Sequence, residues 1–350
     1  MDDRNPSALV AIKRAVLVYE KQPRLARDLA RQASLAFLDQ IRTEGVLNDS
    51  EFVYSWNPLE MLQSLVTLGL LEEALNLAQA ILETRPTDVE LMSFSANLFE
   101  RLGNINQAVN YQYAVVALTP NTIERRRSLA QLWGKSANWY QAYNEWKKVI
   151  ELSTAPVVMD KQAYAQAALE AGLFTEAMDI SNHILQDDPN NGAALGVIGQ
   201  SLLKQDDIGQ AVGYLIRATL LSPDILPPWL ALAEAQKAAG EPQRALDTLR
   251  KAVTALPEAP EALLALGKAC NEVGLLAEGL PHFKKAHNLS PEDPAPALLY
   301  SQTLRRLGHI TESKLLLEGL RSKWKNNPEL AYEYAQGLID ENNAEAALPI

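Results

Sequence analysis

The chain has 350 residues, 47% of them apolar and 21% charged, so it can bury a sizeable core as two domains or as one elongated array. Its 43 acidic and 32 basic residues give a net charge of -11. This argues against a general binder of nucleic acid or of anionic membranes, because both need a basic face. A single cysteine, Cys270, excludes a disulfide framework and a cysteine-based metal cluster.

The first residues do not resemble a targeting signal. The chain opens with acidic residues, and its first apolar stretch is interrupted by Lys13 and Arg14, which makes a poor signal peptide. The sequence has no apolar run of about eighteen residues, so we expect no membrane insertion. We therefore expect a soluble, cytoplasmic protein, in agreement with the low cysteine content.

Residues 1–54 are predicted to form a helical hairpin. Asn5-Pro6 is a good helix start, and a second helix is expected from about Arg24 to Thr43, ending before Gly45. Two interpretations remain open for this segment. It either caps the structure that follows or is the end of an upstream domain.

From residue 55 onward, four kinds of residue recur at intervals of 34, with a single interval of 35. One series of small residues is Ala74, Ala108, Ala142, Ala177, Ala211, Ala245, Gly279, Ser313 and Ala347. A second series is Ala96, Ala130, Ala165, Gly199, Ala233, Gly267, Ser301 and Ala335. A third is Gly69, Gly103, Gly172, Gly240, Gly274 and Gly308, with Ala137, Asp206 and Asn342 at the remaining places. A fourth is Pro86, Pro120, Pro189, Pro223, Pro257 and Pro291.

Each series has a physical reason. Small residues on facing helices let two backbones approach closely, and a glycine suits the left-handed residue that ends the first helix. A proline ends the second helix or begins the connection to the next unit. Apolar residues recur between these positions at the helical spacing of three and four. Each unit is therefore predicted to be a helix-turn-helix of 34 residues, without strands.

This pattern resembles the tetratricopeptide repeat family over about residues 55–350. In the family's frame the repeats begin at residues 55, 89, 123, 158, 192, 226, 260, 294 and 328, and the last one is incomplete. The resemblance implies an all-α fold, a right-handed α-solenoid or superhelix of stacked repeats. Its concave groove would be lined by the first helix of each repeat, through positions 2, 5, 9, 12 and 13.

The sequence ends at Ile350, inside the second helix of the ninth repeat, and shows no polar terminal cap. Two expectations follow. Either that helix is short, or the chain is part of a longer protein, such as the recognition arm of an enzyme or signalling protein. An uncapped apolar end also suggests self-association through stacking on a second copy.

The sequence carries no recognisable catalytic, cofactor or metal motif. His282 and His287 are five residues apart and do not share a helix face as metal ligands would. Cys270 lies where the family has a packed residue, so we expect a buried, unreactive thiol. We therefore predict no catalytic residue, no metal and no cofactor.

Position 9 of the first helices is the most informative groove position. It is occupied by Gln63, Asn97, Gln131, Gln166, Gln200, Glu234, Lys268, Gln302 and Gln336. Seven of these nine side chains are primary amides, which offer one acceptor and two donors to a peptide backbone. The pattern predicts a ladder that holds an extended chain. The alternative is that glutamine is simply a soluble helix former.

Two further groove positions carry predictions. Position 5 becomes apolar in Leu230, Leu264, Leu298 and Tyr332, which suits either the side chains of a partner or packing between first helices. Position 13 alternates in sign in Arg101, Lys135, Glu170, Lys204, Glu272, Arg306 and Asp340. Arg127, with Gln131 and Asn97, is the nearest approach to the family's carboxylate clamp for acidic peptide ends.

The sequence thus predicts a non-enzymatic interaction scaffold that binds a protein, or an extended peptide of one, in its groove. The alternatives are a recognition arm of a larger enzyme or signalling protein, and a self-assembling array. We expect no nucleic acid as partner.

Overall fold

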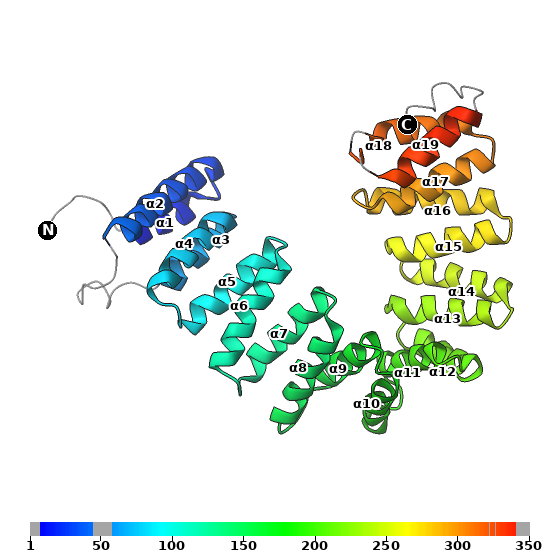
Figure 1. The fold of residues 1–350 in the computed structure, drawn as a ribbon, viewed down its shortest axis with the longest axis horizontal. Coiled ribbons are helices and arrows are strands. Elements are labelled where there is room, and N and C mark those ends of the chain that lie inside the picture. Colours follow the sequence, from blue (N-terminus) through cyan, green and yellow to red (C-terminus); the bar gives the residue numbers. More distant parts are fainter. Residues whose placement is uncertain (1–7, 45–57, 322, 326, 341–350) are drawn as a thin grey trace. The chain divides into compact units, whose positions relative to one another are not determined.

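The computed structural model describes residues 8–44, 58–321, 323–325 and 327–340 (Figure 1). These residues form helices joined by turns, and the described part of the chain contains no strand. The chain divides into two units, residues 1–171 and 172–350, and the boundary falls in the turn of the fourth repeat. Each unit is described by itself.

The first unit holds nine helices among its described residues. They are α1 (Ala8–Val18), α2 (Pro23–Glu44), α3 (Pro58–Thr67), α4 (Leu71–Thr84), α5 (Val89–Arg101), α6 (Ile105–Leu118), α7 (Ile123–Lys135), α8 (Trp139–Leu152) and α9 (Val158–Glu170). The α1 and α2 helices pack against each other, α1 contacts α3, and α2 contacts α4. The Nε of Arg27 in α2 donates to the carbonyl of Leu68, 3.0 Å away. The domain boundary at residue 54 stays a prediction, because it lies outside the described residues.

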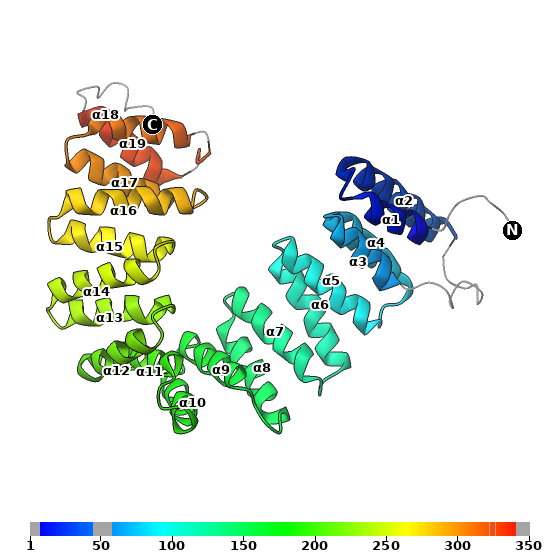
Figure 2. The ribbon, with the colours of Figure 1, turned by 180° about the vertical axis from the view of Figure 1, so that it is seen from behind.

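The second unit continues the same pattern, as both views of the ribbon show (Figure 2). Its described helices are α10 (Phe174–Asp187), α11 (Gly192–Lys204), α12 (Ile208–Leu221), α13 (Leu226–Ala238), α14 (Pro242–Ala255), α15 (Pro260–Glu272), α16 (Leu276–Leu289), α17 (Pro294–Arg306), α18 (Ile310–Arg321) and α19 (Pro328–Asp340). Ile350 and the second half of the ninth repeat lie outside the described residues. The expectations about a cap and about self-association therefore stay predictions.

The first helices of the repeats are α3, α5, α7, α9, α11, α13, α15, α17 and α19, and eight of them begin at the predicted repeat starts. Local capping explains these starts. The side chains of Asp88 and Asn191 each accept a backbone N–H three residues further on, at 3.0 Å. The α13, α15 and α17 helices carry proline in their first turn, where no N–H partner is needed. The ninth start, at residue 55, lies outside the described residues.

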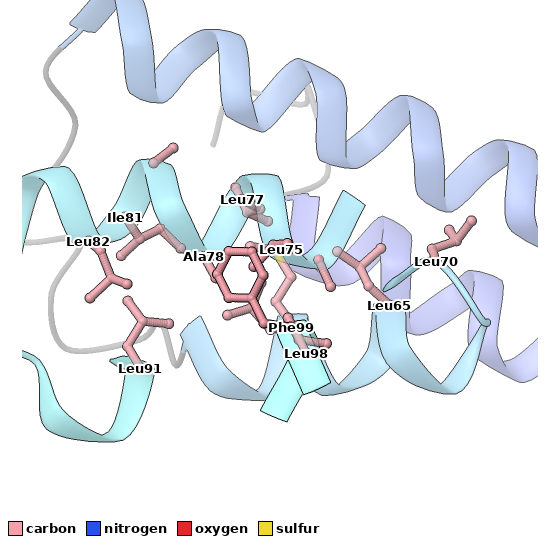
Figure 3. Packing of buried hydrophobic residues seen from close by; sticks show 14 of the residues in the cluster. Leu65, Leu70, Leu75, Leu77, Ala78, Ile81, Leu82, Leu91, Leu98 and Phe99 are labelled. Atoms are coloured by element: carbon pink, nitrogen blue, oxygen red, sulfur yellow. The ribbon is translucent and has the colours of Figure 1, made fainter. Parts of the chain in front are cut away.

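The helices pack in two rows in each unit. The second helices α4, α6 and α8, and likewise α12, α14 and α16, contact the first helix of their own repeat and that of the next. Neighbouring first helices also touch, as in α3 with α5, α11 with α13, α13 with α15, and α17 with α19. The core is therefore a series of clusters along each stack. Figure 3 shows one, where Leu65, Ile81, Leu91 and Phe99 gather between α3, α4 and α5.

The predicted small-residue series lie at the crossings of the two rows. Ala74, Ala108 and Ala211 are fully buried. A Cβ added to Gly267 of α15 would lie 2.6 Å from the ring of Phe283 in α16. The small residues therefore set the distance between helices, as the sequence suggested.

The turn series is confirmed at the backbone level. All six predicted glycines have φ between 77° and 83°, the left-handed region that a side chain disfavours. Ala137 and Asp206, at equivalent positions, adopt the same conformation with φ of 57° and 64°. Asn342 lies outside the described residues. These two turns are therefore strained where the other six are not.

We expect Ala137→Gly to raise the free energy of unfolding by about 0.5–1 kcal/mol, because relief of left-handed strain exceeds the entropy cost of glycine. Asp206→Gly should raise the free energy of unfolding by less, because aspartate tolerates the left-handed region better than alanine does. The midpoint of urea unfolding measures both changes. The control is Gly103→Ala, at φ 79° with no atom within 4 Å of the new Cβ, which should lower the midpoint. Equal midpoints for all variants would contradict the strain.

Candidate functional site

The first-helix face, defined as the side chains at positions 2, 5, 9, 12 and 13 of the first helices, contains the predicted amide row. Its exposed members at position 9 are Gln63, Asn97, Gln131, Glu234, Lys268 and Gln302. The half-buried members are Gln166, Gln200 and Gln336. The row belongs to both units, with Gln63 to Gln166 in the first and Gln200 to Gln336 in the second.

Some of these side chains already have intramolecular partners. The Nε2 of Gln166 donates to Glu170 at 2.8 Å, and the Nε2 of Gln200 donates to the carbonyl of Gly196 at 3.1 Å. Glu234 faces Lys204 at 3.7 Å. By contrast, the side chains of Gln63, Asn97, Gln131 and Gln302 are exposed and make no hydrogen bond within the described residues. These four amides are the ones most free to bind a ligand.

The apolar position 5 is divided between packing and exposure. Leu298 is buried in a cluster with Leu317 and Leu330, so for this residue the packing alternative is correct. Leu230 is half-buried against the cluster of α13 to α15, and Leu264 is half-buried as well. Tyr332 of α19 is 65% exposed. The expected continuous exposed stripe is therefore reduced chiefly to one aromatic side chain.

Arg127 does not have the free guanidinium that a carboxylate clamp requires. Its Nε and a terminal nitrogen donate to the two carboxylate oxygens of Asp160 in α9, each at 2.8 Å. Asp160 is buried, and its hydrogen bond raises the pKa of Arg127 above the ordinary arginine value. The carboxylate that Arg127 was expected to bind is thus supplied by the protein, and the clamp hypothesis for this residue is corrected.

Three of the alternating charges of position 13, Lys135, Glu272 and Asp340, have partners at position 12 of the preceding repeat. Each of three charged residues at position 12 pairs with an opposite charge at position 13 of the following repeat. The pairs are Glu100 with Lys135, Lys237 with Glu272 at 2.6 Å, and Arg305 with Asp340 at 2.7 Å. Sequence reasoning noted the alternation but not its partners. Opposite signs 35 residues apart were the signal that could have revealed them.

Two hollows of the first-helix face lie on α15, α17 and α19, within the second unit. One hollow, of about 550 Å³, is lined by Lys268, Ala295, Leu298, Leu299, Gln302, Pro328, Glu329 and Tyr332. A second, of about 390 Å³, is lined by Gln302, Arg305, Arg306, Tyr332, Glu333, Gln336 and Asp340. Both contain Gln302 and Tyr332, so the two hollows adjoin. We call them together the α15–α19 groove.

The thiol and the two imidazoles considered for chemistry are buried or half-buried. Cys270 is fully buried, and burial raises its pKa to about 11, which keeps the thiol protonated. Burial also lowers the pKa values of His282 and His287. The described residues form no group of three His, Cys, Asp or Glu side chains suited to a metal ion. None of the described helices has both the length and the apolar character needed to cross a membrane.

The fold and this face define the class of protein. Residues 226–269 match the family model of the tetratricopeptide repeat. Together with the 34-residue helix-turn-helix units, this confirms the recognition made from the sequence. The described residues form a solenoid of helix-turn-helix repeats of the tetratricopeptide type, and such a fold generally supports a role as a scaffold for interactions between proteins.

Several solved structures have a similar fold. A tetratricopeptide repeat protein from Parabacteroides merdae is 16% identical, covering 75% of this chain and 98% of its own, with a TM-score of 0.48. Yeast Tom70 is 15% identical, covering 98% and 90%, with a TM-score of 0.45. MamA from Desulfovibrio magneticus RS-1 is 13% identical, covering 49% and 96%, with a TM-score of 0.41. At these identities the likeness concerns the fold alone. No curated protein matches the sequence significantly.

Proposed function

We propose that the protein binds an extended segment of a partner protein on its first-helix face, as a scaffold without catalytic activity of its own. The observation that carries this proposal is the row of amides at position 9. Asn97, Gln131 and Gln302 in this row are exposed and lack hydrogen bonds to the described residues. Unbonded amides repeated at the same helix position favour contact with a repeated ligand, which is what a peptide backbone offers.

The chemistry of the amide supports a backbone ligand. One glutamine side chain can donate to a peptide carbonyl and accept from a peptide N–H at the same time. Such contacts place little demand on the sequence of the bound segment, so side chains elsewhere on the face must supply specificity. The charge pairs of positions 12 and 13 reduce the net charge that a bound segment meets.

The test starts from peptides selected on the intact chain from a random display library. Replacing Asn97, Gln131 or Gln302 by alanine is expected to weaken the binding of a selected peptide that contacts the replaced residue. The expected loss of affinity is about threefold to tenfold, because one or two hydrogen bonds are lost. Fluorescence anisotropy measures the dissociation constant, and circular dichroism verifies helicity.

The matched controls are Gln141→Ala in α8 and Gln243→Ala in α14, two exposed glutamines on second helices. They should leave affinity unchanged. If the position 9 variants also leave it unchanged, with helicity intact, the ladder is wrong. If the library yields no binding peptide, the whole proposal fails.

A further inference from the structure

The second helix of the fifth repeat, α12, has an apolar face that the described residues leave uncovered. Ile216 is 41% exposed and Leu220 is 74% exposed, and two exposed glycines, Gly209 and Gly213, precede them on the helix. The spacings of four, three and four residues place these four positions in one line along the helix. We call this line the α12 face.

The equivalent surface of the neighbouring repeats is polar. The α12 face occupies positions 18, 22, 25 and 29 of its repeat. In the fourth repeat these positions are exposed and hold Thr175, Asp179, Asn182 and Gln186. In the sixth they are exposed and hold Gln243, Asp247, Arg250 and Thr254. Of the eight repeats that contain all four positions, only the fifth has no polar residue at any of them. A helix surface that faces water normally carries polar side chains, so we expect the α12 face to be covered by a partner.

Packing among the described residues does not require the two glycines of this face. A Cβ at Gly209 or Gly213 would meet no atom within 4 Å, and neither residue has the left-handed conformation. In contrast, a Cβ at Gly199 in α11 would lie 2.6 Å from Leu215. Glycine weakens a helix relative to alanine, but an exposed glycine lets another chain approach the backbone closely. The glycines of α12 thus favour a contact from outside the chain.

The order of small and large residues along the α12 face is self-complementary. The midpoint between Gly209 and Leu220 coincides with the midpoint between Gly213 and Ile216. In an antiparallel pair of α12 helices with a two-fold axis at this point, Gly209 of one copy lies opposite Leu220 of the other. Gly213 likewise lies opposite Ile216. Each large side chain of one copy therefore fills the gap that a glycine leaves in the other.

The charges of α12 do not oppose this pairing. Arg217 is the one charged residue of the helix, and it lies at the edge of the face, where its guanidinium donates to the carbonyl of Pro189 at 3.3 Å. The four positions of the face carry no charge, so two copies bring no like charges together at its centre. A second copy thus offers both the apolar surface and the matching shape that the face requires.

We propose that two copies of this chain associate through their α12 faces, as an antiparallel helix pair with two-fold symmetry. This contact uses a second helix, so it is separate from the first-helix face and does not depend on the proposed peptide binding. One helix pair is expected to bury less than the about 1,200 Å² of a stable standard interface. The dimer should therefore be weak and depend on protein concentration.

Sedimentation velocity of the full chain over a wide range of concentrations tests the proposal. We expect the average sedimentation coefficient to rise with concentration. Gly213→Ile fills a gap and Leu220→Gln removes a side chain that fills one, so each should weaken the dimer about tenfold or more. Gly213→Ile should keep its helicity by circular dichroism, because the new Cβ meets no atom within 4 Å.

An exchange of two residues tests the antiparallel pairing itself. A chain that carries both Gly213→Ile and Ile216→Gly again sets one isoleucine against one glycine across the two-fold axis. It should recover most of the association that Gly213→Ile alone loses. The matched control is Leu315→Gln in α18, which is 63% exposed and lies at position 22 of the eighth repeat, as Gly213 does in the fifth. This control should associate as the unaltered chain does.

Three results would overturn the proposal. A chain that sediments as a monomer at every concentration would show that the α12 face does not pair. A dimer that Gly213→Ile and Leu220→Gln leave unchanged would use another surface. An exchanged chain that stays as monomeric as Gly213→Ile would show that the antiparallel register is wrong.

Discussion

Replacing Gly267 by alanine is expected to lower the free energy of unfolding by about 1–3 kcal/mol, the usual cost of overpacking a core. The new Cβ would lie 2.6 Å from the ring of Phe283, which is fully buried. Urea unfolding followed by circular dichroism measures the change. Hydrogen exchange in α15 and α16 should rise more than in α11 and α12.

The partner of this glycine provides the decisive control. Phe283→Ala alone is expected to cost about 3–5 kcal/mol, because it removes a buried aromatic ring and leaves a cavity. In a chain that already carries Phe283→Leu, Gly267→Ala should lower the free energy of unfolding clearly less than it does alone. The smaller leucine side chain leaves the space that the new Cβ needs. Strictly additive effects would show that the steric explanation is wrong.

The second large effect is expected at the ion pair between Arg127 and Asp160. Asp160→Asn keeps the shape of the side chain but removes its charge, leaving a partly buried guanidinium with one weak acceptor. The loss should be about 2–3 kcal/mol, below the value for a fully buried pair because Arg127 remains 32% exposed. The urea midpoint reports it.

The chain contains a matched pair for comparison. Arg250 binds both oxygens of Glu278 at 2.9 Å, in the same two-pronged geometry, but both side chains are exposed. Glu278→Gln should therefore leave the midpoint nearly unchanged, because solvent screens an exposed pair. Equal losses in Asp160→Asn and Glu278→Gln would mean that burial does not decide the strength of these pairs.

The sequence predicted the positions of the described helices closely, because the repeat carries several independent signals in one register. Small residues, turn glycines and terminal prolines each restrict a different part of the 34-residue unit. Even the exceptions follow the frame, since Ala137 and Asp206 take the left-handed conformation that glycine takes elsewhere. Local rules of this kind depend on residues within one repeat and can be read without a structure.

The candidate site was predicted less completely, because side-chain contacts join residues in different repeats. From the sequence, Arg127 was expected to be free to bind a ligand. In the structure its guanidinium donates to Asp160, which lies 33 residues later in the chain. Leu298 read as a possible contact for a ligand but packs against Leu317 and Leu330. The α15–α19 groove depends on how three helices meet, which composition and spacing do not specify. The burial of these side chains and their partners in other repeats could therefore be determined only from the folded structure.

The pairing of position 12 with position 13 of the next repeat has a consequence for the order of the repeats. Glu100 faces a basic residue in the next repeat, whereas Lys237 faces an acidic one. Placing the repeat that contains Glu272 directly after the one that contains Glu100 would set two carboxylates against each other. The units share one architecture but differ in the sign of these charges, so shuffling or duplicating them would change which charges face each other.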